Sequence, residues 1–225
     1  MQRDVVDTGD ARPDAGAGVR EQSGQRLGAA AGPRAQDDLA AARATQYLLL
    51  ATLFARAPGA ALLRDLANVQ GDASPLGLAQ LALADAARMA EPSAVGTEYL
   101  NLFIGVGRGD ILPYGSFYLT GFLHERPLAR VREDMAQLGL ERQGGVFEPE
   151  DHISSLFEIM AGLVGGSFDA HPKAADTFFE RHIEPWAARL MVDVAAAPSA
   201  RFYRHVARLG SVWIEIEQDL VRIPE

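Results

Sequence analysis

Proline and glycine divide this chain into segments whose apolar residues repeat at the spacing of an α-helix, and no other feature constrains the fold as strongly. The first such segment covers residues 37–59 and ends at Pro58-Gly59. Its large apolar side chains fall near one helix face: Leu39, Tyr47, Leu50 and Phe54. The pattern therefore predicts a long amphipathic helix at the start of the folded region.

The same signals predict helices over residues 74–92, 93–105, 116–125, 127–139 and 149–166, and three more over residues 171–223, separated near Pro185 and Pro198. Ser74 followed by Pro75 is a favourable N-cap and first helical position. Alternating strand patterns are missing, apart from VWIEI, which fits a helix equally well. We expect an all-α, many-helix bundle that forms a single domain over residues 37–225.

Residues 1–36 differ from the rest of the chain. They are rich in Gly, Ala, Asp and Arg and contain almost no large apolar side chains. Such a segment cannot bury enough apolar surface to offset the entropy lost on ordering. We expect a disordered N-terminal tail.

The charge and the cysteine count narrow the choice of partners and compartment. The 225 residues carry a formal net charge of −9, which opposes binding to nucleic acid or to anionic membranes and favours basic peptides. With no cysteine, the chain cannot form disulfides, thiolate metal sites or a cysteine nucleophile. Because we find neither a secretory signal nor an apolar run long enough to span a bilayer, we expect a cytoplasmic protein without stable membrane insertion.

Motifs for catalysis and metal binding are missing. No Glu-x-x-His or HExxH pair exists, and Lys173, the only lysine, does not end a phosphate loop. We therefore predict no metal site, no resident cofactor and no catalytic residue. One enzymatic alternative stays open, in which His152 works with Asp151 or Glu158 as a general acid–base pair.

The stretch EPEDH concentrates titratable groups before an apolar helix. If Pro149 is the first helical position, Glu150 and Asp151 lie in the first turn, where the helix dipole favours carboxylates. His152 then lies at the margin of an apolar stripe that faces the core: Ile153, Leu156, Phe157, Met160, Leu163 and Val164. Helix packing alone explains most of this pattern, so the stretch by itself does not establish a binding site.

Two further clusters contain aromatic residues at points where a predicted helix begins or is interrupted. After a Gly-rich loop, Pro113-Tyr114-Gly115-Ser116 precedes a short helix that Ser116 would cap. Loops carry function disproportionately, and this junction has more aromatic residues than a connector needs. In HIEPW, Trp186 brings so much apolar area that we expect it in the core.

Taken together, EYLNLF, LPYGSFYLTGFLHE, EPEDH and HIEPW occur in the order found in TorD/DmsD-type chaperones. The chain resembles this family of maturation factors for molybdenum-containing redox enzymes over residues 37–223, and most of all members that accompany formate dehydrogenases. It departs from the family at Gly115, where members often carry an acidic residue.

The resemblance implies a non-enzymatic helical chaperone that binds the twin-arginine signal peptide and the apo form of a molybdoenzyme. It would assist cofactor insertion and delay export until maturation. The recognition residues carried over by position are Tyr114, Ser116, Glu150, Asp151 and His152.

A receptor for paired arginines followed by an apolar segment needs carboxylates beside a hydrophobic groove. Glu150 and Asp151 are carboxylates at the margin of the predicted apolar stripe and would meet this need. We expect Asp151→Asn or His152→Ala to weaken peptide binding with little loss of folding. The linker LERQGGVFE would allow two protomers to exchange helices, so a homodimer is a further option.

Overall fold

A computed structural model describes residues 33–105, 109–141 and 148–223. Residues 1–32 of the expected tail and residues 142–147 of the LERQGGVFE linker lie outside these ranges. Residues 33–36, which we had expected in the tail, instead form the start of the first helix.

The described residues form ten α-helices and one π-helix, with no β-strand among them, which confirms the all-α prediction. The elements are α1 (Pro33–Ala55), α2 (Ala60–Ala67), α3 (Pro75–Arg88), α4 (Pro92–Tyr99), η1 (Leu100–Ile104), α5 (Gly115–Thr120), α6 (Arg126–Gln137), α7 (Ile153–Val164), α8 (Ala174–His182), α9 (Ala187–Ala196) and α10 (Phe202–Val221).

Several predicted helix ends are confirmed by local geometry. The Ser74 hydroxyl accepts a hydrogen bond from the Gly77 amide at 3.0 Å, so Ser74 caps α3. Gly139 lies just after α6 with φ of +68°, a conformation that favours glycine. The sequence patterns did not predict α2, and they placed the start of α7 at Pro149, although this helix begins at Ile153.

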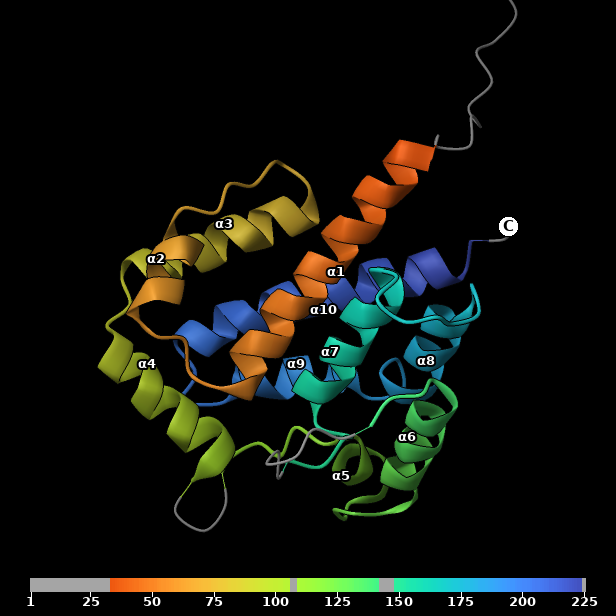
Figure 1. The fold of residues 1–225 in the computed structure, drawn as a ribbon. Helices are drawn as coiled ribbons and strands as arrows, with labels where there is room; N and C mark the ends of the chain where they lie inside the picture. Colours follow the sequence, from red (N-terminus) through yellow and green to blue (C-terminus); the bar gives the residue numbers. More distant parts are fainter. Residues whose placement is uncertain (1–32, 106–108, 142–147, 224–225) are drawn as a thin grey trace, which may run out of the picture.

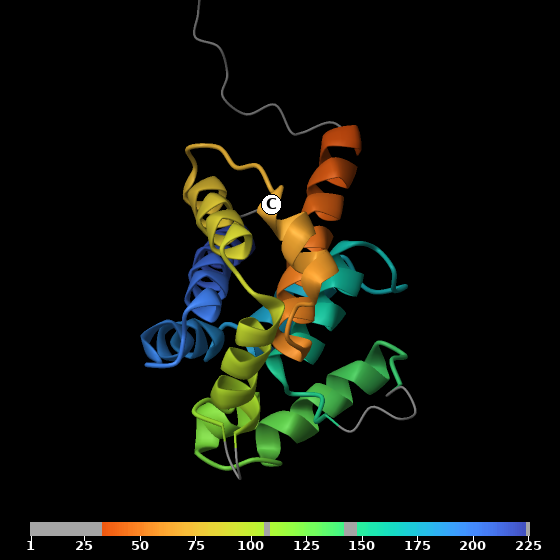
Figure 2. The ribbon, with the colours of Figure 1, turned by 90° about the vertical axis from the view of Figure 1, so that its left-hand side faces the viewer.

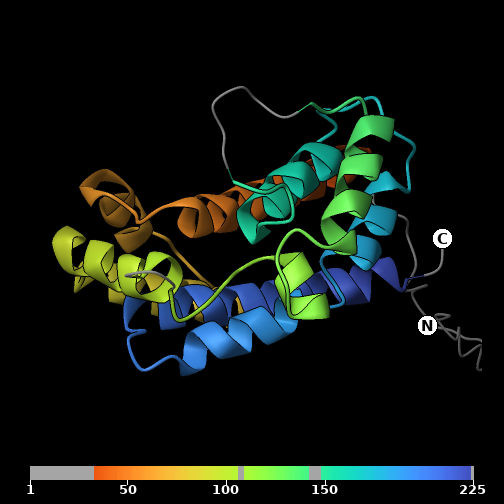
Figure 3. The same cartoon turned by 90° about the horizontal axis from the view of Figure 1, so that it is seen from below.

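The core forms where α1 packs on α7 and where α10 packs on α9 and α3 (Figure 1). Seen from below, α1 and α7 lie on one side of the molecule and α9 and α10 on the other (Figure 3). Tyr47 joins the two sides, because its ring lies 5.6 Å from that of Phe157 and 5.3 Å from that of Trp213. The apolar stripe predicted for α7 is buried at Ile153, among other positions.

Two buried carboxylates, Glu217 and Glu98, hold α1 and α4 against α10. Glu217 is fully buried and accepts hydrogen bonds from Arg43 of α1 at 2.9 and 2.7 Å. Glu98 of α4 accepts from the backbone amides of Arg201, Phe202 and Tyr203 at 2.8, 3.0 and 2.7 Å. These amides are unpaired donors at the start of α10, so a carboxylate from another helix caps them.

At the lower end of the molecule, α4 continues into η1, and α5 and α6 follow (Figures 1 and 2). Gly105 ends η1 with φ of +64°. The Ile111 amide donates to the Leu102 carbonyl at 2.8 Å, which aligns the segment that leads into α5. Among the described helices, none combines the length and apolarity needed to cross a membrane.

Candidate functional site

The two sequence motifs that carry the family resemblance meet at one junction. Tyr114 and His152 form an antiparallel bridge, and their rings lie 5.0 Å apart in an edge-to-face arrangement. On either side, the Gly115 amide donates to the Asp151 carbonyl and the Ile153 amide to the Pro113 carbonyl, both at 2.9 Å. Backbone hydrogen bonds therefore join the start of α5 to the start of α7.

Asp151 caps α5 from across this junction. Its Oδ2 accepts a hydrogen bond from the Ser116 amide at 2.7 Å, while Tyr114, the N-cap residue of α5, makes no side-chain cap. Asp151 is only 1% exposed and Ser116 is fully buried. A hydrogen bond between a carboxylate and an amide at a helix N-terminus is charge-assisted and stabilising. The Asp151 side chain therefore holds α5 in place and is not open to a ligand.

His152 has a similar structural position. It is the N-cap of α7, where Nδ1 accepts from the Ser154 amide at 3.2 Å and lies 2.7 Å from the Ser154 hydroxyl. Burial lowers the pKa of His152 from 6.5 to about 4, although the charges of Glu148 and Asp151 act in the opposite direction. The ring is therefore neutral near pH 7.

The other two predicted residues are also engaged within the chain. Glu150 Oε2 accepts from Arg132 of α6, with Nε at 2.9 Å and Nη2 at 2.8 Å. The Tyr114 hydroxyl donates to Glu148, and burial followed by this bond raises the pKa of Tyr114 well above its usual range. The five predicted residues thus come together, but not as the open carboxylate rim that we had expected.

The enzymatic alternative finds no support in this geometry. In the described structure His152 makes no hydrogen bond to Asp151 or Glu158, and Glu158 is exposed while His152 is buried. An acid–base pair needs the two groups within reach of each other and of a substrate. Burial and capping account for His152 instead.

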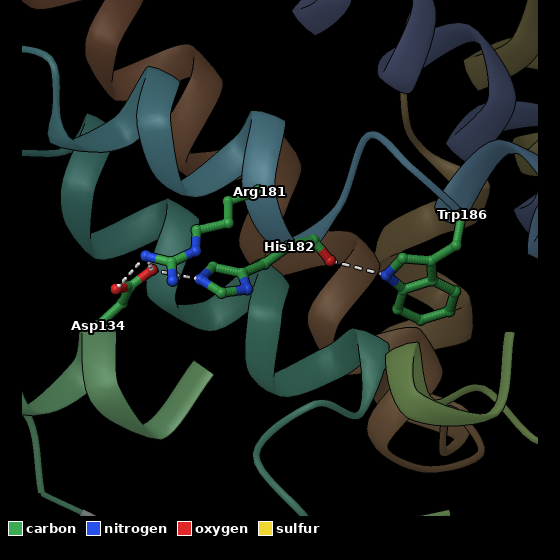
Figure 4. Close-up of polar contacts among 4 residues, drawn as sticks. All are labelled: Asp134, Arg181, His182 and Trp186. Carbon is green, nitrogen blue, oxygen red and sulfur yellow. Dashed lines mark hydrogen bonds and ion pairs between the residues drawn. The ribbon is translucent and has the colours of Figure 1, made fainter. Parts of the chain in front are cut away.

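Behind the junction, Trp186 packs against α5 (Figure 4). It is 2% exposed, as predicted for a core residue, and its Nε1 donates to the His182 carbonyl at 2.7 Å. A Cβ atom on Gly115 would lie 3.2 Å from Trp186 Nε1, so the indole fills the space that a side chain would need. This packing favours glycine at position 115.

Figure 4 also shows how α6 is tied to α8 beside this site. Asp134 accepts from Arg181 at 2.7 and 2.9 Å and lies 2.6 Å from Nε2 of His182. Burial lowers the pKa of His182, and the bond to Asp134 opposes this shift. We interpret this cluster as a structural link between α6 and α8, because Asp134 accepts the hydrogen bonds that Arg181 and His182 offer.

An open cleft of about 670 Å³ lies between α5 and α9, next to the junction. Apolar residues of the segment before α5 and of α5 itself form much of its wall, including Ile111, Phe117 and Leu119. Two carboxylates, Asp110 and Asp193, also line it. Neither aspartate stands out in the sequence, because a lone acid on a helix or in a loop is typical of an ordinary solvated residue.

A family model described as "nitrate reductase delta subunit" matches residues 70–192, more than half of the chain. The chain belongs to this family. Among its relatives, the chaperone protein TorD of Shewanella loihica is 27% identical over 199 residues, which cover 78% of this chain and 91% of that protein. The chaperone protein TorD of Shewanella oneidensis is 28% identical over 205 residues, 82% of this chain and 92% of that protein.

A solved structure described as a redox enzyme maturation protein from Archaeoglobus fulgidus is a more distant likeness, with 19% identity, a TM-score of 0.49, and coverage of 85% of this chain and 99% of that one. The family match and the TorD relatives confirm the resemblance to TorD/DmsD-type chaperones. In this member of the family, the two signature motifs are the two halves of the α5–α7 junction.

Proposed function

We propose that this chain is a cytoplasmic chaperone for a molybdenum-containing oxidoreductase. It binds the twin-arginine signal peptide and the apo form of that enzyme, assists cofactor insertion, and delays export until the enzyme is mature. The observation that carries the proposal is the match to chaperones named TorD along nearly their whole length.

The open cleft supports this role. A twin-arginine signal peptide offers two guanidinium groups followed by an apolar segment. The cleft offers two carboxylates and one arginine, Arg189, beside apolar walls, so its lining keeps a net negative charge. The net charge of −9 also favours encounter with a basic peptide, through an attraction that weakens as salt rises. The buried junction contributes indirectly, because it fixes α5, which forms one wall of the cleft.

Calorimetric titration of the full chain with synthetic signal peptides tests the proposal. The panel contains leaders from formate dehydrogenase-like, sulfoxide or amine-oxide reductase-like and nitrate reductase-like enzymes encoded in the same genome. We expect one leader to bind, and a matched peptide with both arginines replaced by lysine to bind more weakly, because lysine keeps the charge but loses the planar fork. Failure of every leader to bind would contradict the proposed function.

A co-purification experiment tests the second part of the proposal. The apo-enzyme with its leader, made in cells that cannot synthesise the molybdenum cofactor, should co-purify with the chaperone, and the cofactor-loaded enzyme should not. Equal recovery of both forms would show that the chaperone does not distinguish the immature client.

A further inference from the structure

The acceptors for the two leader guanidinium groups must be carboxylates that solvent and ligand can reach. Asp151 does not meet this requirement, because it is 1% exposed and already caps α5. Glu150 is 9% exposed and bonded to Arg132. Glu150 and Asp151 Oδ2 are therefore committed to contacts within the chain, and Asp151 Oδ1 is buried. The third carboxylate of the motif, Glu148, is exposed and accepts from the Tyr114 hydroxyl.

The two carboxylates of the α5–α9 cleft differ in this respect. Asp110 is exposed, and its Oδ2 accepts from the Ser199 hydroxyl at 3.2 Å. Asp193 is half-buried on α9, and its Oδ2 accepts from the Tyr118 hydroxyl at 2.9 Å. In each case a hydroxyl group orients one carboxylate oxygen, and no other hydrogen bond or ion pair to either carboxylate is formed by the described residues. Such an oriented carboxylate is prepared for a guanidinium fork.

The wall beside Asp193 already interacts with one guanidinium group. Arg189, one turn before Asp193 on α9, places its guanidinium carbon 5.8 Å from the centre of the Tyr118 ring. The Tyr118 ring in turn packs against Trp186, with 5.3 Å between the ring centres. An aromatic face beside a carboxylate attracts guanidinium groups through both cation–π and ionic interactions.

Apolar surface continues from the cleft. Leu119 lines it and is 43% exposed, and Phe122, just after α5, is 70% exposed. With Ile111 and Phe117, which also line the cleft, Leu119 gives it an apolar wall that suits a segment that is itself apolar.

We propose that Asp110 and Asp193 accept the paired arginines of the leader, and that Ile111, Phe117 and Leu119 of the cleft wall receive the apolar segment that follows. This inference rests on the proposed function and assigns it to the α5–α9 cleft instead of the signature-motif carboxylates. The occupant is a peptide with two adjacent arginines and an apolar continuation.

Single variants Asp110→Asn and Asp193→Asn of the full chain test the assignment by calorimetry with the leader that the wild type binds. Each should weaken binding by about tenfold, the effect of one charge-assisted hydrogen bond. Asp219→Asn, which removes an exposed charge on α10, is the matched control and should change little. Asparagine can still accept from the Tyr118 hydroxyl, so the thermal midpoint of Asp193→Asn should stay close to that of the wild type.

A double-mutant cycle then separates direct contact from indirect effects. Against a leader whose arginines are replaced by glutamine, the loss caused by Asp193→Asn should disappear. The inference is overturned if both aspartate variants bind as tightly as Asp219→Asn, if their losses persist with the glutamine leader, or if only Glu150→Gln weakens binding. In each of these cases the wild type still binds a leader, so the proposed function survives; if the wild type binds none, the function itself fails.

Discussion

Replacing Asp151 with alanine removes the group that caps α5 from the other side of the junction. The lost interaction is the 2.7 Å hydrogen bond from the Ser116 amide to Asp151 Oδ2, and the amide is left buried without a partner. The backbone bonds between Gly115 and Asp151 and between Ile153 and Pro113 remain, so the junction is weakened but not removed.

The expected loss follows from the burial of both groups. A hydrogen bond to a charged group contributes about 1.5–3 kcal/mol, and an unsatisfied buried donor costs about 1–3 kcal/mol. We therefore expect Asp151→Ala to lower the free energy of unfolding by about 3 kcal/mol, which is about 6–12 °C in thermal midpoint for a domain of this size. Asp151→Asn keeps an acceptor and should lose about half as much.

Urea denaturation measures this change, with Asp219→Ala, an exposed residue of α10, as the control. Hydrogen exchange should accelerate first at the amides of α5, because the loss is local to that helix. A variant Asp151→Ala with wild-type stability and wild-type exchange in α5 would refute the capping role. From the capping contact we now expect Asp151→Asn to lose stability, whereas the sequence had suggested little loss of folding.

Three further predictions concern buried polar groups. Because the pKa of His152 is about 4 in the fold and 6.5 when unperturbed, unfolding takes up a proton below pH 6.5; stability should fall by about 3 kcal/mol between pH 6.5 and 4. His152→Asn can still cap α7, but its free energy of unfolding should change less between pH 6.5 and 4, as measured by denaturation curves across that range. The same pH dependence in the variant and the wild type would contradict this prediction. Glu98→Ala leaves three amides of α10 uncapped and should cost about 2–4 kcal/mol in urea denaturation, with Glu98→Gln milder; equal losses would argue against a charge-assisted cap. Glu217→Ala should cost about 3–5 kcal/mol in thermal unfolding, because it leaves Arg43 and the buried Tyr47 hydroxyl without their acceptor. Glu217→Leu combined with Arg43→Met and Tyr47→Phe removes all three polar groups and should be nearly neutral; similar losses would contradict this prediction.

Sequence patterns were sufficient for the helical fold but not for every boundary. The prolines at 185 and 198 correctly separate α8, α9 and α10, because proline disrupts a continuing helix. The eight residues of α2 were too few to show a clear period. Pro149 suggested the start of α7, but a turn closed by the His152 amide and the Pro149 carbonyl at 3.0 Å delays the helix to Ile153.

The site was harder to predict because burial depends on contacts between distant parts of the chain. The motifs were found, and they do meet, but the sequence does not reveal that an amide 35 residues away from Asp151 occupies its carboxylate. Nor does it show that Arg132 engages Glu150. For the same reason, Asp110 and Asp193 gain significance only when folding brings them to one cleft.

Photo-crosslinking tests most directly whether a twin-arginine leader binds in the α5–α9 cleft. A leader with a photoreactive residue next to its arginines is bound to the full chain and irradiated, and the adducts are located by mass spectrometry. The account predicts adducts on α5, on α9 and near Asp110, and their loss when unlabelled leader competes. Competed adducts confined to surfaces away from these elements would contradict it.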